Sequence, residues 1–163
     1  MNTKEKIIKI ASNLIFEKGY KNISLNEIAE KVGIKKPSIY HYFQCKEDIY
    51  KVVINDFIDN FEKQVDNILK SNEESCQKIK EFILLCMEPV INKKNLKFLI
   101  IEKIFHENYS ENKNKEMLQK RDDLFKKMEL IISEYTKDKK LQVTNREIIM
   151  AIIGTIAMFI ADR

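Results

Sequence analysis

One stretch constrains the fold of this chain more than any other: residues 24–46, SLNEIAEKVGIKKPSIYHYFQCK. The Ser24 hydroxyl can cap a helix while the Glu27 side chain reaches back to the Ser24 amide, which is a capping box. Gly33 can supply the left-handed backbone conformation that ends this helix. Pro37 suits the first turn of a second helix, where a missing amide costs little. The stretch therefore predicts a helix-turn-helix.

The second predicted helix has one apolar and one polar face. Ala29 lets it cross the first helix closely, and four side chains can fill the wedge between them: Ile28, Val32, Ile34 and Ile39. The side chains left outside donate hydrogen bonds or carry positive charge: Lys35, Lys36, Ser38, Tyr40, His41 and Tyr42. In a helix-turn-helix, such a face enters the major groove of DNA. Because a short Lys/Tyr surface can also be merely solvated, this interpretation depends on the flanking segments.

Helices are predicted on both sides of the motif. An amphipathic helix precedes it and stops at Gly19, with one apolar stripe formed by Ile7, Ile8, Ala11, Leu14 and Ile15. A long helix over residues 46–69 follows, with apolar side chains at helical spacing: Ile49, Val52, Val53, Phe57, Phe61, Val65 and Ile68. Three such helices make a small DNA-binding domain, and the long helix should join it to the rest of the chain.

An ordered skeleton, FxxxGYxxxSLxxIAxxxGIxxPSIYHYFxxKxxIY, runs through roughly the first fifty residues. On these residues the chain resembles the N-terminal signature of the TetR family of bacterial transcriptional repressors. The remainder resembles the family only in being helical and apolar. Two residues depart from the pattern: Lys35 stands where the family usually has a Ser or Thr cap, and Cys45 where it often has Ser. A positive charge at Lys35 is unfavourable beside the positive end of the helix dipole. A lysine at this position is better explained if its ammonium binds a DNA phosphate.

The predicted DNA contacts fall into two groups. The edge expected to face the groove carries Lys36, Pro37, Ser38 and Tyr42. The residues better placed for phosphates, which position a protein without reading sequence, are Ser24, Lys35, Tyr40, His41 and Lys46. The resemblance implies that a ligand in the body shifts the long helix and changes the spacing of two heads in a homodimer.

Charge and composition agree with a DNA-binding head on a neutral body. The net charge is +4, and residues 1–50 hold nine lysines against six acids, leaving 20 basic and 19 acidic residues afterwards. Gly and Pro are scarce, Trp is absent, and no alternating β-type run occurs. We predict an all-α fold, with a three-helix DNA-binding domain over residues 1–47. A helical regulatory and dimerisation domain should cover residues 48–163.

Three cysteines, Cys45, Cys76 and Cys86, lack metal-ligand spacing, and their odd number argues against a disulfide scaffold. Cys45 could act as an oxidation switch, although the neighbouring acids oppose a lowered thiol pKa. The N-terminal MNTKEKIIK has no apolar signal core, so we expect a cytoplasmic protein. The most apolar run, residues 148–161, is shorter than the roughly 20 residues that span a membrane. We expect no metal and no cofactor.

Capping and periodicity predict the first helices of the body. Ser71 with Glu74 forms a second capping-box pattern, which should open a helix that runs to about Met87, before Pro89. Residues 96–105 are strongly apolar and predict a buried helix.

The remaining body segments are read in the same way. The polar residues 109–115 predict a surface loop, and residues 117–135 predict an amphipathic helix. Residues 137–140 form a charged linker. Thr144 with Glu147 should cap the last helix.

Aromatic and sulfur-containing side chains of the body could line a cavity for a small, largely apolar ligand. The candidate lining residues are Phe57, Phe61, Phe82, Cys86, Phe98, Glu102, Phe105, His106 and Met128. Among them, Glu102 and His106 would be the polar groups that orient the ligand. An apolar stripe on a helix is core by default, so the same residues could be ordinary core. A large closed cavity would favour a small-molecule sensor. A filled core with an exposed apolar patch would favour a DNA-bound adaptor that binds another protein.

The last helix is apolar around nearly its whole circumference, which predicts burial on all sides. In so small a body, one side should meet a partner subunit, with Gly154 and Ala157 allowing close approach. Pairing of residues 117–135 and 148–161 with their copies would give a four-helix interface with a two-fold axis. The residues expected there are Leu124, Met128, Ile131, Ile149, Ile152, Ile153, Ile156, Phe159 and Ile160.

The residue inventory argues against an enzyme. The chain has two histidines, no nucleophile elbow, no phosphate-binding glycine loop and no H-x-x-x-H metal pair. We therefore predict a transcriptional regulator that binds double-stranded DNA, a repressor released from a palindromic operator by a small apolar ligand. The alternative is the DNA-bound adaptor.

Overall fold

The computed structural model describes residues 1–91 and 115–161. The all-α prediction is confirmed, because every regular element in these two ranges is helical. In chain order the elements are α1 (Thr3–Lys18), the 3-10 turn η1 (Tyr20–Asn22), α2 (Leu25–Val32), α3 (Lys36–Ile39), α4 (Lys46–Lys70), α5 (Ser75–Ile91), α7 (Lys115–Thr136) and α8 (Asn145–Ala161).

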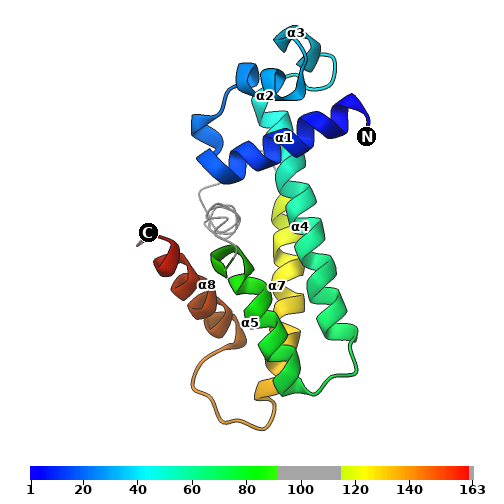
Figure 1. The fold of residues 1–163 in the computed structure, drawn as a ribbon. Coiled ribbons are helices and arrows are strands. Elements are labelled where there is room, and N and C mark those ends of the chain that lie inside the picture. Colours follow the sequence, from blue (N-terminus) through cyan, green and yellow to red (C-terminus); the bar gives the residue numbers. More distant parts are fainter. Residues whose placement is uncertain (92–114, 162–163) are drawn as a thin grey trace.

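The first three helices form a head at one end of the molecule, around the start of α4 (Figure 1). The apolar stripe predicted for α1 is confirmed: Ile7, Ala11, Leu14 and Ile15 are buried, and Ile8 is half-buried. Ile28, Ile39, Phe43 and Ile49 complete the core of the head. These residues hold α2 and α3 against α1 and α4.

The long helix α4 runs from the head along the whole body (Figure 1). Its bounds, Lys46–Lys70, agree with the predicted span of 46–69. Most of the predicted apolar positions are buried, and Val52 and Phe57 are half-buried. The predicted boundary between residues 47 and 48 stays a prediction, because α4 is continuous across it.

The body is a bundle in which α4 packs on α7, and α5 packs on both α7 and α8. The largest side chains at its centre have almost no exposed surface: Phe82, Met128, Ile131, Ile132 and Ile149. Hydrophobic burial of this kind is the main source of stability in a helical bundle.

Ion pairs add a polar seam between α4 and α7. Lys127 Nζ lies 2.7 Å from Glu62 Oε1 and 2.8 Å from Asp66 Oδ1. Hydrogen bonds from Lys127 to Asp66 and Glu62 raise the pKa of the lysine above its ordinary value. A second ion pair joins the same two helices closer to the head, where Lys120 Nζ of α7 lies 3.0 Å from Asp59 Oδ1 of α4. The seam fixes the half of α4 that lies farther from the head.

Two boundary predictions for the body need correction. Ser71 does not open a helix; it ends α4, and its hydroxyl donates a hydrogen bond to the Ile68 carbonyl at 2.9 Å. The next helix begins at Ser75 and continues to Ile91, past Pro89. The capping-box pattern was misleading because a serine hydroxyl can satisfy the last carbonyls of one helix as well as the first amides of another.

The cap of the last helix is confirmed. Glu147 Oε2 accepts a hydrogen bond from the Thr144 amide at 2.6 Å, and the Glu147 amide donates one to Thr144 Oγ1 at 3.2 Å. The predicted buried helix at residues 96–105 lies outside the described residues. The predicted loop at 109–115 does too, except for Lys115, with which α7 begins.

Candidate functional site

The turn between α2 and α3 has the geometry that the sequence predicts. Gly33 has φ 81° and ψ 31°, and its amide donates hydrogen bonds to the carbonyls of Ala29 and Glu30 at 3.0 and 3.1 Å. The Ile34 amide donates to the Ala29 carbonyl at 2.9 Å. A Cβ at Gly33 would meet nothing within 4 Å. The turn therefore needs glycine for its backbone conformation and not for space.

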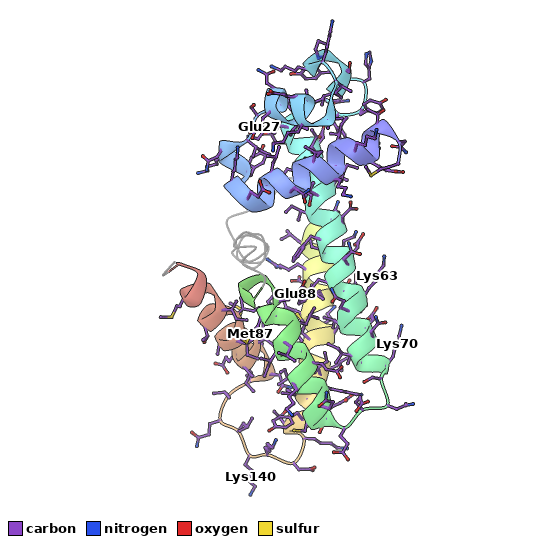
Figure 2. The ribbon with its side chains drawn as sticks, in the orientation of Figure 1. Glu27, Lys63, Lys70, Met87, Glu88 and Lys140 are labelled. Atoms are coloured by element: carbon purple, nitrogen blue, oxygen red, sulfur yellow. The ribbon has the colours of Figure 1, made fainter. Side chains whose placement is uncertain are left out.

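The start of α2 confirms half of the predicted capping box. Ser24 Oγ accepts a hydrogen bond from the Glu27 amide at 3.1 Å. The predicted return bond is wrong, because the Glu27 carboxylate instead accepts from Lys18 Nζ at 2.6 Å. That bond raises the pKa of Lys18 and ties the end of α1 to α2. Figure 2 labels Glu27 at this junction in the head.

The recognition segment (residues 35–42) is short and anchored by its apolar side. Only four residues, Lys36–Ile39, form α3, with Pro37 in its first turn. Ile39 and the following Phe43 are 1% and 5% exposed, so they fix the segment to the head. Lys35 precedes α3 with extended backbone, and its side chain caps no amide of the helix. The Lys35 side chain is exposed, so solvent reaches its ammonium.

The structure leaves most of the predicted DNA contacts of this segment exposed. The side chains of Lys35, Lys36, Pro37, Tyr40, His41 and Tyr42 are exposed, and Ser38 is half-buried. Tyr40 is 50% and Tyr42 is 43% exposed, which is high for large aromatic residues. Lysines beside exposed tyrosines offer charge for phosphates together with hydroxyl donors and flat apolar rings for base edges.

Two of the predicted phosphate contacts lie outside this segment. The exposed Ser24 keeps its hydroxyl hydrogen available while its oxygen caps α2. Lys46 has internal partners: its Nζ donates to the Ile23 carbonyl at 2.7 Å and lies 4.3 Å from the Tyr20 ring centroid. A phosphate contact for Lys46 stays a prediction, and its position also gives it a structural role.

Sequence reasoning missed the cluster around Tyr20. The Tyr20 hydroxyl donates a hydrogen bond to Glu47 Oε1 at 2.7 Å, and its ring centroid lies 4.5 Å from that of Tyr50. The bond from Tyr20 is the main reason that the pKa of Glu47 is held below its ordinary value. The GY pair at Gly19 and Tyr20 was the available signal, but nothing local indicated its distant partners.

Residues 7–53 match the family described as "Bacterial regulatory proteins, tetR family". This match covers the head and the start of α4, the part whose turn geometry and exposed recognition segment are described above. The head of the chain is that of the TetR family of transcriptional regulators.

Relatives of known name match part of this chain. The HTH-type transcriptional regulator YdgC of Bacillus subtilis is 30% identical over 90 residues, which cover 55% of this chain and 46% of YdgC. IcaR of Staphylococcus epidermidis, a negative regulator of the biofilm operon icaADBC, is 35% identical over 72 residues, or 44% of this chain and 37% of IcaR. The aligned part of the chain thus spans less than half the length of these relatives.

Solved structures of transcriptional regulators share the fold over nearly the whole chain. A TetR/AcrR-family regulator from Thermobifida fusca has a TM-score of 0.67 at 24% identity, covering 97% of this chain and 84% of its own. The ketosteroid regulator KstR2 of Mycobacterium tuberculosis has a TM-score of 0.77 at 15% identity, covering 98% and 82%. At these identities the likeness establishes the fold alone.

Five of the predicted ligand residues lie in or beside the core of the body, and their ligand role stays a prediction. Phe61, Phe82, Cys86 and Met128 are at most 9% exposed and pack in the core, with Phe57 half-buried beside them. Burial raises the pKa of the Cys86 thiol to about 12, so this cysteine is an uncharged core residue. The other candidates, Phe98, Glu102, Phe105 and His106, lie outside the described residues.

A cavity of about 500 Å³ lies between α5 and α8, and none of those five residues lines it. Its lining is almost wholly apolar: Ile83, Met87, Val143, Glu147, Ile148, Ala151, Ile152, Thr155 and Ile156. The side chain of Val143 is 51% exposed, so the cavity is a groove open to solvent. Figure 2 labels Met87 where α5 faces α8. The groove was missed because it depends on how two distant helices pack.

The predicted dimer residues are also placed differently from expectation. Six of them are buried within the single chain, at no more than 8% exposed: Leu124, Met128, Ile131, Ile149, Ile153 and Ile156. Ile152 is half-buried, and the side chains of Phe159 and Ile160 are outside the described set. The exposed face of α8 carries Met150, Ala151, Gly154, Thr155 and Met158 instead. One side of α8 is therefore uncovered in the single chain, and the expectation that a partner subunit covers it stays a prediction.

Two further observations bear on function. No helix in the described ranges is long and apolar enough to cross a membrane. Among residues 1–91 and 115–161, no three His, Cys, Asp or Glu side chains gather in a way that could hold a metal ion.

Proposed function

We propose that this chain is a DNA-binding repressor whose head holds duplex DNA. The observation that carries the proposal is the exposed recognition segment, with its lysines and tyrosines outward and Ile39 and Phe43 buried beneath. The name of the relative IcaR, a negative regulator, supports repression over activation. The chain would act in the cytoplasm, and its chemistry is binding and not catalysis.

Base contacts are proposed for the edge formed by Lys36, Pro37, Ser38 and Tyr42. Phosphate contacts are proposed for the flanking donors Ser24, Lys35, Tyr40 and His41, with Lys46 as an auxiliary contact. Phosphate contacts set affinity and its dependence on salt, whereas base contacts set preference among sequences.

The test begins with duplexes that the wild-type protein selects from a random-sequence library. Lys36→Ala combined with Tyr40→Ala should abolish tight binding, and Ser38→Ala should change the selected sequence. Lys63→Ala is the matched control, because Lys63 is exposed on α4 far from the head (Figure 2). Unchanged affinity in the double variant would show that the recognition segment is not the DNA surface.

A homodimer is proposed through the exposed face of α8. Met150, Gly154 and Met158 recur every four residues, so they form one stripe along the helix. Met158 is 74% exposed, and a Cβ on Gly154 would meet nothing within 4 Å, so this stripe is uncovered in the single chain. A two-fold contact along it would present two recognition segments to half-sites about 34 Å apart, on a palindromic operator.

Sedimentation velocity tests the dimer. Met158→Glu should shift the population to monomer, because a buried unpaired carboxylate is costly at an interface. Leu84→Glu is the control: Leu84 is 58% exposed on α5, outside the proposed stripe. A wild-type chain that stays monomeric at micromolar concentration would remove the proposal.

The groove between α5 and α8 is the proposed site for a small apolar effector that releases DNA. A volume of about 500 Å³ lies within the usual range for ligand sites, and Glu147 and Thr155 supply the polar groups that such sites need. The ligand would act only if it binds one arrangement of the two heads better, and couplings of about 1–3 kcal/mol are typical.

Apolar compounds can be screened for thermal stabilisation, and each hit then tested for weaker operator binding. Ala151→Phe should block stabilisation by filling the groove, whereas Phe82→Leu should leave it, since Phe82 lies in the core. The open groove also favours the second candidate, the adaptor that binds a protein. Absence of any stabilising compound, with DNA binding intact, would make the adaptor the better interpretation.

A further inference from the structure

The first turn of α1 lies beside the end of the recognition segment. Lys4 Nζ is 5.7 Å from the centroid of the Phe43 ring, and Phe43 directly follows the exposed Tyr42. Figure 1 shows the N-terminal end of α1 on the side of the head where the chain leaves α3. Lys4 therefore stands at the rim of the surface assigned above to DNA.

The charge of Lys4 is not neutralised at this corner. The neighbouring Glu5 carboxylate accepts hydrogen bonds from Asn2 instead. The Asn2 backbone amide and side-chain Nδ2 donate to the two Glu5 oxygens at 3.0 and 2.9 Å. No carboxylate within residues 1–91 or 115–161 forms an ion pair with Lys4. The Phe43 ring lies near the outer limit for a cation–π contact and gives only weak attraction. The exposed ammonium of Lys4 can therefore bind an external anion.

The position of Lys4 on its helix distinguishes it from the other lysines of α1. Lys4 precedes Ala11 by seven residues and thus lies on the face of α1 that packs into the head. Lys9 is also exposed, but it is turned about 140° around the helix axis, away from that face. Only Lys4 borders Phe43 and the recognition segment.

We propose that Lys4 binds a DNA phosphate at the edge of the groove that receives α3. The DNA surface would then extend from the helix-turn-helix onto the first turn of α1. The recognition segment alone spans four helical residues, so a contact on a second element would fix its angle to the duplex. This inference rests on the proposed DNA-binding function.

The experiment compares Lys4→Gln with Lys9→Gln, which each remove one exposed charge from α1. The probe is a duplex selected by the wild-type protein, and its affinity is measured over a series of salt concentrations. Lys4→Gln should reduce the slope of log Kd against log salt by about 0.9 per bound subunit, the value for one phosphate contact. Lys9→Gln and the charge-retaining Lys4→Arg should keep the wild-type slope.

Ethylation of single phosphates locates the contact. Ethylation of one particular phosphate should weaken DNA binding by the wild type but not by Lys4→Gln. Ethylation of every other contacted phosphate should weaken binding by both proteins. Identical slopes and ethylation patterns for Lys4→Gln and wild type would overturn the inference and leave the proposed function standing. A slope lost in Lys4→Arg as well, with a lowered melting temperature, would assign Lys4 to packing on Phe43 and also overturn it. Failure of the wild type to select any duplex would overturn both proposals.

Discussion

The Tyr20 hydroxyl donates a hydrogen bond to Glu47 Oε1 at 2.7 Å, joining the turn after α1 to the first turn of α4. Lys46 strengthens the same junction, because its ammonium lies over the Tyr20 ring and bonds the Ile23 carbonyl. The head and the start of α4 are thus linked by side chains 27 positions apart, and not only by the chain itself. Any movement of α4 in the proposed regulation should carry the head with it.

Tyr20→Phe should raise the pKa of Glu47 toward its ordinary value of 4.5, because the bond from Tyr20 is the largest cause of its depression. A carboxyl group with a depressed folded pKa stabilises the fold above its unfolded pKa, and this contribution is lost as pH falls through the folded pKa. The wild type should therefore exceed the variant in melting temperature at neutral pH, and the gap should close in acid. NMR titration of the Glu47 side chain checks the pKa directly. An unchanged Glu47 titration in Tyr20→Phe would contradict the assignment.

Lys127→Met should loosen the seam between α4 and α7. The hydrogen bonds to Asp66 and Glu62 raise the pKa of Lys127, so their stabilisation is present below the unfolded pKa and is lost as pH rises through the folded pKa. A double-mutant cycle with Asp66→Asn should give a coupling of up to about 1 kcal/mol, because both side chains are partly solvated.

Urea denaturation at low and high salt measures that coupling, which salt should reduce. Lys9→Met, at an exposed lysine of α1 in the head, is the control and should show no coupling to Asp66. A coupling of the same size for Lys9 would mean that the effect is general and does not come from this seam.

Gly33→Ala and Gly154→Ala should change stability in opposite directions, although a Cβ would meet nothing within 4 Å at either site. Gly33 has φ 81°, which costs an alanine roughly 1 kcal/mol or more. Gly154 lies inside α8, where alanine stabilises a helix by roughly 0.5–1 kcal/mol. Chemical denaturation gives both values. A Gly33→Ala protein as stable as the wild type would show that the turn tolerates another backbone conformation.

Phe82→Ala should cost about 3–5 kcal/mol, the usual value for a large cavity in a core, because Phe82 is 0% exposed. Leu84→Ala, two residues away and 58% exposed, should change stability by no more than about 0.5 kcal/mol. Denaturation midpoints test this matched pair. A mild effect at Phe82 would support its earlier interpretation as a ligand contact.

The three thiols should react with an aromatic disulfide reagent in the order of their exposure. Cys76 is exposed and should react first, Cys45 is half-buried and should follow, and Cys86 should react only on unfolding. Burial raises the pKa of Cys86 to about 12, so it carries no thiolate at neutral pH. Mass spectrometry of the labelled peptides gives the order. Early labelling of Cys86 would show that α5 opens locally.

The sequence by itself determined the features that depend on residues within about one helical turn. The glycine turn at Gly33, the proline start of α3 and the Thr144–Glu147 cap all follow from local backbone chemistry, and each agrees with the structure. The helical periodicity of residues 46–69 likewise needed no distant information, because the spacing of apolar side chains is a property of the helix itself.

Only the tertiary structure decided which side of each apolar helix is covered, and which polar groups pair. Glu27 meets Lys18 across the α1–α2 packing and not its own cap. Phe82 and Met128 lie in the core while Met87 lines a groove, although all three are apolar residues of amphipathic helices. A helix fixes the angle between its side chains, but its burial depends on neighbours that arrive from distant parts of the chain.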